Sequence, residues 1–476
     1  MAKQPMLKFV NIARSMPEKR AAEARKGDFD EIYAEFADAR AAEQASRCSQ
    51  CGVPYCQAHC PLSNNIPDWL RMTAMGRLEE AYRISQATNT FPEICGRICP
   101  QDRLCEGNCV IEQSGHGTVT IGSVEKYITD TAWEKGWVEE ITPFAERAES
   151  VGIIGAGPAG LAAADVLRRA GVQVTVYDRH DRAGGLLTYG IPGFKLEKDV
   201  VMRRVDQLAR AGVAFVMKCN VGSDVSFQEL REKHDAVLVA TGVYKTRDLR
   251  GPGAGAKGIV DAIDYLITSN KVGFGDKVAD YEDGTLNAEG KRVVVIGGGD
   301  TAMDCVRTAI RQGATSVKCL YRRDRANMPG SQREVQNAEE EGAEFVWLAN
   351  PKGFAGDPVT GVIVQKMRLG EADVSGRQAP EPIEGADYTE GADLVIKALG
   401  FEPEDLAEGF AEPDLPLTRW GTVQAEYTTG ATALGGVFAA GDIVRGASLV
   451  VWAIKDGRDA AGAILKSFEA AKMAAE

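Results

Sequence analysis

The sequence has few histidines, no long apolar run and no excess of positive charge, and each absence excludes a class of protein. The four histidines are isolated, and none stands in a spacing typical of a catalytic or metal-binding histidine. The 55 basic side chains are outnumbered by 68 acidic ones, and the net charge of −13 argues against a nucleic-acid partner. The longest apolar stretch, residues 151–167, is interrupted by glycines, a proline and Asp165, so we expect no membrane span.

The distribution of cysteine is the most informative feature of the composition. Residues 48–109 contain eight cysteines, whereas the rest of the chain contains three, Cys219, Cys305 and Cys319. The N-terminus, MAKQPMLKFVNIARSMPEKR, has neither an apolar core nor a cleavage site of a secretory signal, so we expect a cytoplasmic protein. Thiols stay reduced in that compartment, and clustered cysteines there indicate metal or cluster ligation rather than disulfides.

The first 130 residues are predicted to be mostly helical. Residues 28–47 form a predicted amphipathic helix, and residues 69–88 continue in the same style. Residues 131–149 are polar and lack strand patterning, so they are predicted to be a connection. The apolar side chains with helical spacing in the first segment are Phe29, Ile32, Tyr33 and Phe36.

A glycine-rich turn with dinucleotide-binding spacing follows a predicted buried strand near residue 150. In the G-x-G-x-x-G pattern, the first glycine permits a tight turn, the second a close approach to pyrophosphate, and the third close helix packing. Asp178 ends the next predicted strand, near the position of the ribose-binding acid in this motif. A structural turn without a ligand is the alternative. The residues of the turn are Gly155, Gly157, Pro158, Ala159 and Gly160.

A second turn of this kind follows another predicted strand and precedes a helix, at residues 297–302. No acid ends the next strand, where Arg322 and Arg323 stand instead, with Arg325 nearby. Arginines pair with a 2′-phosphate, whereas a carboxylate repels it, so the pattern favours NADPH over NADH. The alternative is that these arginines are solvated surface charges, one of them neutralised by Asp324. The turn consists of Gly297, Gly298, Gly299, Asp300, Thr301 and Ala302.

With these turns, the chain resembles FAD-dependent pyridine-nucleotide oxidoreductases that have two dinucleotide-binding domains. Three further segments carry the resemblance: a Gly-Gly turn, the end of the strand DAVLVATG, and the end of GVFAAGD. The resemblance implies that all three lie beside FAD, and that Asp442 hydrogen-bonds its ribityl–pyrophosphate region. The residues concerned are Gly184, Gly185, Leu186, Leu187, Ala240, Thr241, Gly242, Gly441 and Asp442.

The resemblance implies an α/β fold with two Rossmann-like domains, in which the NADPH domain is inserted into the FAD domain. An α-helical iron–sulfur domain precedes them. We expect residues 1–147 to form the helical domain, 148–285 and 405–476 the two parts of the FAD domain, and 286–404 the NADPH domain.

The clustered cysteines form two groups, each with short spacings and a Cys-Pro step. Such spacing lets a loop wrap an iron–sulfur cluster, although two four-cysteine zinc sites are the alternative. Flavin electrons need an acceptor, and zinc cannot accept them. The three later cysteines form no close pair that could serve instead. The first group is Cys48, Cys51, Cys56 and Cys60, and the second is Cys95, Cys99, Cys105 and Cys109.

Over essentially its whole length, the chain resembles the small (beta) subunits of bacterial NADPH-dependent glutamate synthases, and dihydropyrimidine dehydrogenase shares the module. The matching stretches are SRCSQCGVPYCQAHCPLSNNIPDW, EICGRICPQDRLCEGNCV and YRRDRANMPGSQREVQNAEEEG. The resemblance implies two [4Fe-4S] clusters, the fourth ligand of the second being Glu125 or Cys95, whereas spacing alone equally permits two contiguous sets of four. The implied interleaved sets are Cys48, Cys51, Cys56 and Cys109, and Cys60, Cys99 and Cys105.

This family resemblance implies an electron-input subunit in a hetero-oligomer. NADPH reduces FAD, and the electrons leave through the clusters to a large (alpha) subunit that makes L-glutamate from L-glutamine and 2-oxoglutarate. The residue after Met1 is Ala2 rather than a nucleophilic cysteine, so glutamine hydrolysis is not expected in this chain. A reductase with a different partner, such as ferredoxin, and a non-enzymatic scaffold are the competing hypotheses.

Overall fold

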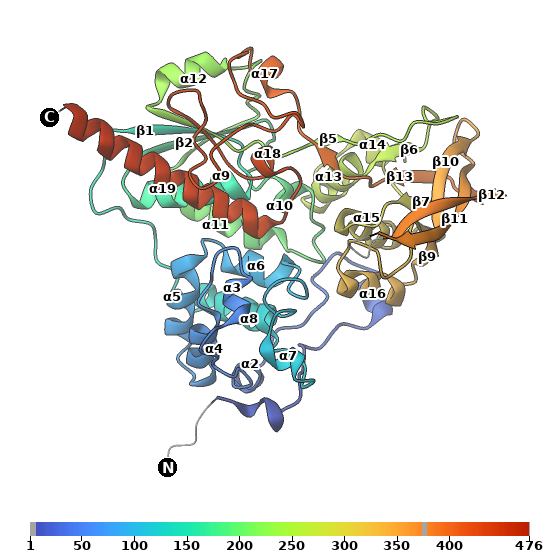
Figure 1. The fold of residues 1–476 in the computed structure, drawn as a ribbon, viewed down its shortest axis with the longest axis horizontal. Helices are drawn as coiled ribbons and strands as arrows, with labels where there is room; N and C mark the ends of the chain where they lie inside the picture. The colour runs from blue at the N-terminus through green and yellow to red at the C-terminus, as the bar shows by residue number, and fades with distance from the viewer. Residues whose placement is uncertain (1–5, 374–377, 476) are drawn as a thin grey trace.

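Three parts of the chain pack against one another in the computed structural model, which describes residues 6–373 and 378–475 (Figure 1). A helical part, blue to cyan in the figure, lies beside two α/β units. The first α/β unit carries the long C-terminal helix, and the second carries a small antiparallel sheet at its outer edge. The predicted fold class, two α/β units preceded by a helical part, is confirmed.

The first α/β unit is built on a parallel five-stranded sheet in the order β15-β4-β1-β2-β3. β15 comes from near the end of the chain and pairs with β4, so the second α/β unit is inserted into the first, as the order of the motifs predicted. β1 and β4 are almost wholly buried, which is typical of a sheet covered on both faces. The strands are β1 Ser150–Ile154, β2 Gln173–Asp178, β3 Ala214–Met217, β4 Ala236–Val239 and β15 Val437–Ala439.

Helices cover this sheet. The C-terminal helix, α19, packs against α9, the helix that follows the first glycine-rich turn. At their crossing, an added Cβ on Gly457 of α19 would lie 2.0 Å from the carbonyl oxygen of Ala159 in α9. The two backbones therefore touch. The helices are α9 Pro158–Arg169, α10 Leu186–Tyr189, α11 Lys198–Arg210, α12 Phe227–Lys233, α18 Asp442–Arg445 and α19 Val450–Ala475.

The second α/β unit repeats the plan with a parallel sheet in the order β6-β13-β7-β8-β9, and β10-β11-β12 form the antiparallel sheet beside it. β6 precedes residue 286, yet it pairs with β13 in this second sheet. Its elements are β6 Ile259–Asp261, α13 Ala262–Gly273, α14 Ala279–Glu282, β7 Arg292–Ile296, α15 Asp300–Arg311, β8 Ser316–Tyr321, α16 Gln332–Glu340, β9 Glu344–Trp347, β10 Ala349–Ala355, β11 Gly361–Ala372, β12 Gln378–Gly391 and β13 Leu394–Lys397.

Two chain segments connect the α/β units, and they run side by side. β5 (Lys245–Thr246) and β14 (Phe401–Glu402) form an antiparallel two-stranded ribbon between the two sheets. The short helix α17 (Leu406–Gly409) follows the ribbon back into the first unit.

The helical part packs its short helices around a buried cluster that includes Trp69, Leu70 and Ile128. Along the described chain, no helix is both long enough and apolar enough to cross a membrane. The bounds are η1 Lys8–Val10, α1 Ala22–Arg25, α2 Asp38–Ala45, α3 Tyr55–Ala58, α4 Ile66–Ala74, α5 Leu78–Thr88, α6 Pro92–Ile98, α7 Val110–Gln113 and α8 Ile121–Glu134.

The predicted helix over residues 28–47 is wrong for its first ten residues, because only α2 is helical there. Residues before α2 pair instead with an earlier segment: the Ala34 amide donates to the Glu18 carbonyl at 2.9 Å. The predicted apolar face is divided, since Ile32 and Phe36 are buried while the Phe29 ring lies near Phe194 of the first α/β unit. α8 likewise extends to Glu134, so the predicted connection begins after that residue.

The backbone contact between α9 and α19 predicts opposite effects for two glycine substitutions in one helix. Gly457→Ala destabilises the protein by about 1–3 kcal/mol or more, because the methyl group forces the helices apart. Gly462→Ala meets nothing within 4 Å, so it stabilises the helix by about 0.5–1 kcal/mol. Thermal unfolding midpoints of the two variants and the wild type check this. Equal midpoints for both variants would contradict it.

Candidate functional site

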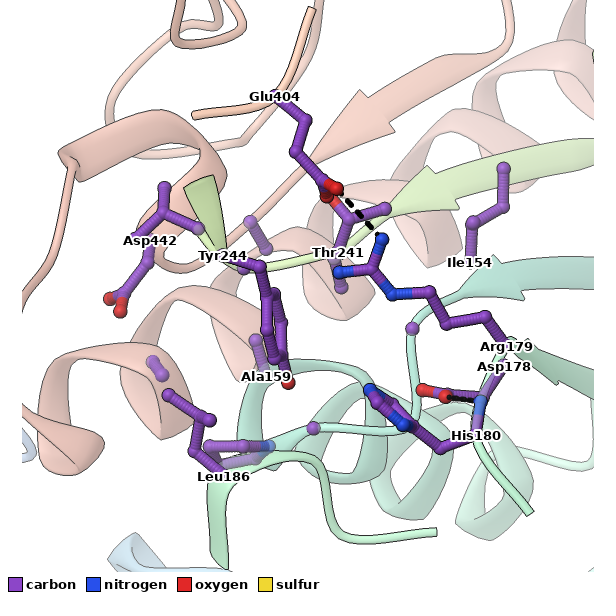
Figure 2. Close-up of a pocket in the computed structure, with 18 of the residues that line it drawn as sticks. Ile154, Ala159, Asp178, Arg179, His180, Leu186, Thr241, Tyr244, Glu404 and Asp442 are labelled. Carbon is purple, nitrogen blue, oxygen red and sulfur yellow. Dashed lines mark hydrogen bonds and ion pairs between the residues drawn. The ribbon is translucent and has the colours of Figure 1, made fainter. Parts of the chain in front are cut away.

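The first candidate site is a cavity of about 480 Å³ at the carboxyl ends of the strands of the first sheet (Figure 2). Parallel α/β sheets bind their ligands at this edge. The turn after β1, the end of β2, the segment after β4 and the start of α18 all contribute to its wall. Residues predicted from sequence that line it are Gly155, Gly157, Pro158, Ala159, Asp178, Leu186, Leu187, Ala240, Thr241, Gly242 and Asp442.

The glycines of the first turn divide into two that permit close packing and one that leaves room for a ligand. Gly155 has φ 109°, and an added Cβ would lie 2.3 Å from the Ala240 carbonyl oxygen. A Cβ on Gly160 would lie 2.0 Å from the Gly155 carbonyl oxygen. Gly157 lies directly before α9, and a Cβ added to it would meet no atom of the described residues within 4 Å. The turn therefore leaves a cradle at the amino end of a helix, which suits a phosphate.

The second turn has the same geometry at the matching positions. Gly297 has φ 151°, and an added Cβ would lie 2.2 Å from the Ala398 carbonyl oxygen. Gly299, directly before α15, again faces open space. Gly298 lies against the Tyr321 ring, which an added Cβ would meet at 2.4 Å. The two turns, which are far apart along the chain, thus form the same kind of cradle for a phosphate.

Asp178 organises the first turn through its carboxylate. The Ala156 amide donates to Oδ2 at 2.7 Å, and the His180 amide donates to Oδ1 at 2.8 Å. The predicted ribose-binding acid therefore lies in the cavity wall and also holds the glycine-rich turn in place. Its role toward a ribose stays a prediction.

Among the residues of this wall that were not predicted from the sequence are the polar side chains of Arg179, His180, Tyr244 and Glu404. Arg179 donates a hydrogen bond to Glu404 at 2.8 Å, drawn as a dashed line in Figure 2. The Arg179 guanidinium lies 4.7 Å from the centroid of the Tyr244 ring. Arg179 and His180 directly follow Asp178, a position that could have indicated them. Tyr244 and Glu404 reach the wall from the connecting segments, for which no motif gives a signal.

Two polar atoms of this wall have no hydrogen-bond partner among the described residues. They are the Thr241 hydroxyl and Nε2 of His180, both buried. Buried polar groups are nearly always hydrogen-bonded, so an unpaired atom at a cavity wall indicates a polar ligand group. Gly185 and Gly441 do not line the cavity, but both have positive φ, 54° and 80°, and an added Cβ would lie 2.8 Å from Cα of Gly157 and 2.9 Å from Cβ of Ala159, respectively.

Asp442 stands at the start of α18 and lines the cavity (Figure 2). Burial raises the pKa of its carboxyl group from 3.8 to about 6, because the charged form loses its hydration. The side chain is thus poised to accept or donate a hydrogen bond to a ligand hydroxyl group.

A second cavity of about 410 Å³ lies where all three parts of the chain meet. Asp300 and Thr301 at the start of α15 line it, and so does Cys99 of the helical part. It shares part of its wall with the first cavity, so the two sites adjoin. The shared residues are Ile191, Ser448, Leu449 and Val450.

Of the residues predicted for the second unit, Asp300 and Thr301 line this cavity, whereas Gly297, Gly298, Gly299, Arg322 and Arg323 do not. Asp300 accepts from the Ser331 amide at 2.9 Å, so its carboxylate fixes the loop before α16. Arg322 is exposed, and Nε of Arg323 is buried with no partner among the described residues. Arg325 is committed to Glu339 at 2.7 Å. Arg322 and Arg323 therefore stay available for a phosphate, and Arg325 does not.

The first set of cysteines implied by the resemblance gathers in one small pocket. Cys48, Cys51, Cys56 and Cys109 all line it, although Cys109 is far from the others in sequence. Burial, together with the neighbouring Cys48 and Cys109 thiols, raises the pKa of the Cys56 thiol to about 12. Cys60 does not line this pocket.

The remaining cysteines lie near one another and near Glu125. Burial raises the pKa of Cys60 to about 12, and Cys95 and Glu125 add to that rise. A hydrogen bond to Cys95 and then burial raise the pKa of Cys99, with Glu125 and Cys105 contributing. Cys95 and Glu125 are therefore both placed beside this group.

Glu125 is a buried carboxyl group with its own hydrogen bonds. Asn64 donates to its Oε1 at 2.8 Å and Ser85 donates at 3.3 Å. Burial nevertheless raises its pKa to about 8. Elsewhere in proteins such a group is paired or binds a metal.

A single zinc ion needs four ligand atoms about 2.3 Å from one point. Across the residues that the structure describes, no group of three or more His, Cys, Asp or Glu side chains converges in this way to hold a metal ion.

Comparison with known proteins identifies the family. The family described as dihydropyrimidine dehydrogenase domain II, 4Fe-4S cluster, matches residues 25–137, and pyridine nucleotide-disulphide oxidoreductase matches residues 149–457. The glutamate synthase [NADPH] small chain of Azospirillum brasilense is 70% identical over 465 residues, covering 98% of this chain and 96% of that one. The chain belongs to the family of glutamate synthase [NADPH] small chains. The resemblance inferred from the motifs is confirmed.

Other proteins are similar to this chain over most of its length or over its α/β units. The glutamate synthase [NADPH] small chain of Escherichia coli is 46% identical over 476 residues, covering 98% of this chain and 99% of that one. Putative oxidoreductase AegA of the same organism is 47% identical over 460 residues, covering 95% of this chain and 69% of that one. The structure of FprA from Mycobacterium tuberculosis shares the fold of the α/β units, with a TM-score of 0.59, 22% identity and coverage of 69% and 87%.

The raised pKa of Asp442 predicts that flavin-free wild-type protein and the Asp442→Asn variant differ in stability, and that the difference depends on pH. Its folded-state pKa of about 6 exceeds the ordinary 3.8, so the folded form loses stability as pH rises between these values. Asp442→Asn removes this loss, which is at most about 3 kcal/mol. We expect the variant to melt above the wild type at about pH 8, with the difference closing near about pH 4.

The matched control is Asp248→Asn, because an ion pair with Lys397 lowers the pKa of this exposed carboxyl group. Asp248→Asn is expected to lower the melting midpoint, the opposite of Asp442→Asn. It removes the ion pair with Lys397, which stabilises the fold only above the ordinary pKa of the carboxyl group. Melting curves across this pH range check both variants. A pH-independent difference for Asp442→Asn would contradict the assignment.

Proposed function

We propose that the chain is the electron-input subunit of a glutamate synthase. It takes electrons from NADPH and passes them to a large (alpha) subunit that makes L-glutamate from L-glutamine and 2-oxoglutarate. The observation that carries this proposal is 70% identity over nearly the whole length of a named glutamate synthase small chain. The intact glycine-rich turns and all eight clustered cysteines support it.

The cavity in the first unit is proposed as the FAD site. When bound, FAD accepts a hydride and releases electrons singly, which links a two-electron donor to one-electron carriers. The amides at the start of α9 and the open cradle at Gly157 suit its pyrophosphate. Asp178 accepts hydrogen bonds from the ribose, and Asp442 and the unpaired Thr241 hydroxyl bind along the ribityl chain. Further contacts come from Gly155, Pro158, Ala159, Gly160, Gly185, Leu186, Gly242 and Gly441.

The second turn is proposed as the NADPH site. The open cradle at Gly299 and the amino end of α15 receive the pyrophosphate. Arg322 and Arg323 hold the 2′-phosphate, which selects NADPH over NADH. The wall shared by the two cavities lets a nicotinamide from the second unit reach a flavin in the first. The other contributing residues are Gly297, Gly298, Asp300 and Thr301.

The helical part is proposed to hold two [4Fe-4S] clusters. One is bound by Cys48, Cys51, Cys56 and Cys109, which share a pocket. The other is bound by Cys60, Cys99, Cys105 and Glu125, with Cys95 as the competing fourth ligand.

The position of Cys99 gives the path a direction. Cys99 lies on the wall of the second cavity, which adjoins the first, whereas the first cysteine set lies apart from both cavities. A cluster held by Cys60, Cys99 and Cys105 would thus be the one-electron carrier beside the cavities, and a cluster held by Cys48, Cys51, Cys56 and Cys109 would be the carrier farther from them. The residues of this chain fix the sites of the carriers and keep them close together.

A reductase with a different partner is the second candidate. The observation that favours it is the 47% identity to a putative oxidoreductase of which this chain spans 69%. The same cofactor sites serve either function, so the partner decides between them. We propose a cytoplasmic hetero-oligomer in both cases.

Association with a large subunit tests the function. We expect the chain, tagged in its native host, to co-purify with a large subunit, and the complex to form L-glutamate from L-glutamine and 2-oxoglutarate with NADPH. The isolated chain is expected to oxidise NADPH with an artificial acceptor and to form no glutamate. Rapid ferredoxin reduction by a chain that never binds such a subunit would favour the second candidate.

Glu125 and Cys95 make different predictions for the iron content. Two [4Fe-4S] clusters correspond to about eight iron atoms per chain. Because Glu125 is the proposed ligand, Glu125→Ala lowers iron and acid-labile sulfide toward about half, whereas Cys95→Ser keeps them near wild type. Glu125→Gln, which preserves volume, separates lost ligation from a cavity. Retained iron in Glu125→Ala together with lost iron in Cys95→Ser would assign the ligand to Cys95.

A further inference from the structure

The amino-terminal arm, residues 6–36, leaves the helical part and reaches the second α/β unit. In Figure 1 its blue segment passes beside α16. Lys19 bonds Glu340 at 2.5 Å and Asn337 at 3.2 Å. Arg25, which is 1% exposed, pairs with Glu340 at 2.8 Å and with Glu341 at 3.2 Å. The arm is thus hydrogen-bonded to α16 and ion-paired with Glu341, the residue that follows this helix.

Both ends of the arm are also tied to the helical part. Near its start, Arg14 pairs with Glu106 at 3.0 Å. Near its end, Glu31 pairs with Arg97 at 2.6 Å, in a pair that is almost wholly buried. The stretch between these anchors is the part that spans to the second unit.

The first α/β unit joins the same contact through one aromatic side chain. Phe194 lies under two guanidinium groups of α15, with Arg307 at 4.3 Å and Arg311 at 4.0 Å from its ring centroid. Both arginines pair with the buried Glu341, at 2.9 and 2.7 Å. Because Arg25 also pairs with Glu341, the arm and both α/β units meet at one buried charge cluster.

Chain connectivity alone does not set the angle between the two α/β units. The two connecting segments form only the short β5–β14 ribbon, and a two-stranded ribbon without further packing is marginally stable. In a hinge, a few residues of such connecting segments absorb the rotation of one unit relative to the other. The non-covalent contacts between the units must therefore fix their orientation.

The second cavity depends on that orientation because its wall comes from every part. The first unit contributes Phe194 and Lys195, the second contributes Asp304, and the arm contributes Tyr33 and Phe36. On this wall, the Lys195 ammonium group of the first unit donates a hydrogen bond to Asp304 of the second unit at 2.8 Å. A rotation about the ribbon would separate these walls.

We propose that the amino-terminal arm is a positioning element that holds the second α/β unit in the orientation that closes the second cavity. Arg25 is its main positioning residue, and Lys19 supports it. This inference rests on the proposed function for its consequence, since the orientation brings the nicotinamide site against the flavin site.

The experiment compares Arg25→Met with Lys26→Met in the full chain with its cofactors. Lys26 is the matched control because it is next in sequence and its ion pair, at 2.7 Å, is with Glu23 inside the arm. Lys19→Met, at a partly exposed position, tests the same contact with little risk to folding. One measurement is hydrogen exchange of α16 and of residues 190–197. The other is the anaerobic rate of flavin bleaching at saturating NADPH.

We expect Arg25→Met to raise exchange in α16 and to lower the limiting bleaching rate by roughly tenfold, because the closed orientation becomes a minor state. Lys19→Met gives a smaller change in the same direction. Affinity for 2′,5′-ADP stays unchanged in both, since this probe needs only the second unit. Lys26→Met matches the wild type.

Wild-type exchange and bleaching rates in both Arg25→Met and Lys19→Met would overturn the proposal. An equal loss in Lys26→Met would also overturn it, because the effect would then follow any change in the arm. If NADPH fails to bleach the wild-type flavin, the proposed function fails, and the exchange data alone decide the role of the arm.

Discussion

Both α/β units depend on a contact between two backbones that only glycine allows. At Gly155 and Gly297, an added Cβ would lie 2.3 and 2.2 Å from a carbonyl oxygen of the adjacent segment. The contact lets α9 and α15 begin directly over the carboxyl edge of their sheets, with unpaired N–H groups facing a cavity. Because the second glycine of each fingerprint spacing faces open space, each turn can pack tightly on one side and receive a phosphate on the other.

A buried charge cluster also joins the three parts of the chain, and Phe194 of the first unit packs against its arginines. Glu341 is fully enclosed by guanidinium groups from α15 and from the amino-terminal arm. Such a cluster costs desolvation energy and therefore tolerates few geometries, so it is suited to fixing an angle between parts. An electron carrier needs this precision, since its redox centres must stay close together.

The sulfur sites combine local spacing with long-range folding. Cys48, Cys51 and Cys56 lie on one short segment, yet Cys109 completes their pocket from a turn after α6. Glu125 reaches the other group from α8, and its carboxyl group is held by Asn64 and Ser85. The fold thus sorts eight thiols into two neighbourhoods that differ from the two groups along the chain.

The sequence by itself determined the strand–turn–helix units, their order and the resulting insertion, because each depends on residues that are neighbours along the chain. It also indicated Asp178 and Arg322–Arg323, whose places follow from the length of one unit. It misled over residues 28–37, where helical spacing of apolar side chains reflects packing on separate parts. Only the tertiary structure decided that Tyr244 and Glu404 line the first cavity, that the two cavities share a wall and that Arg25 reaches Glu341. These contacts join residues from distant segments, and no local pattern encodes which of many exposed polar side chains will meet after folding.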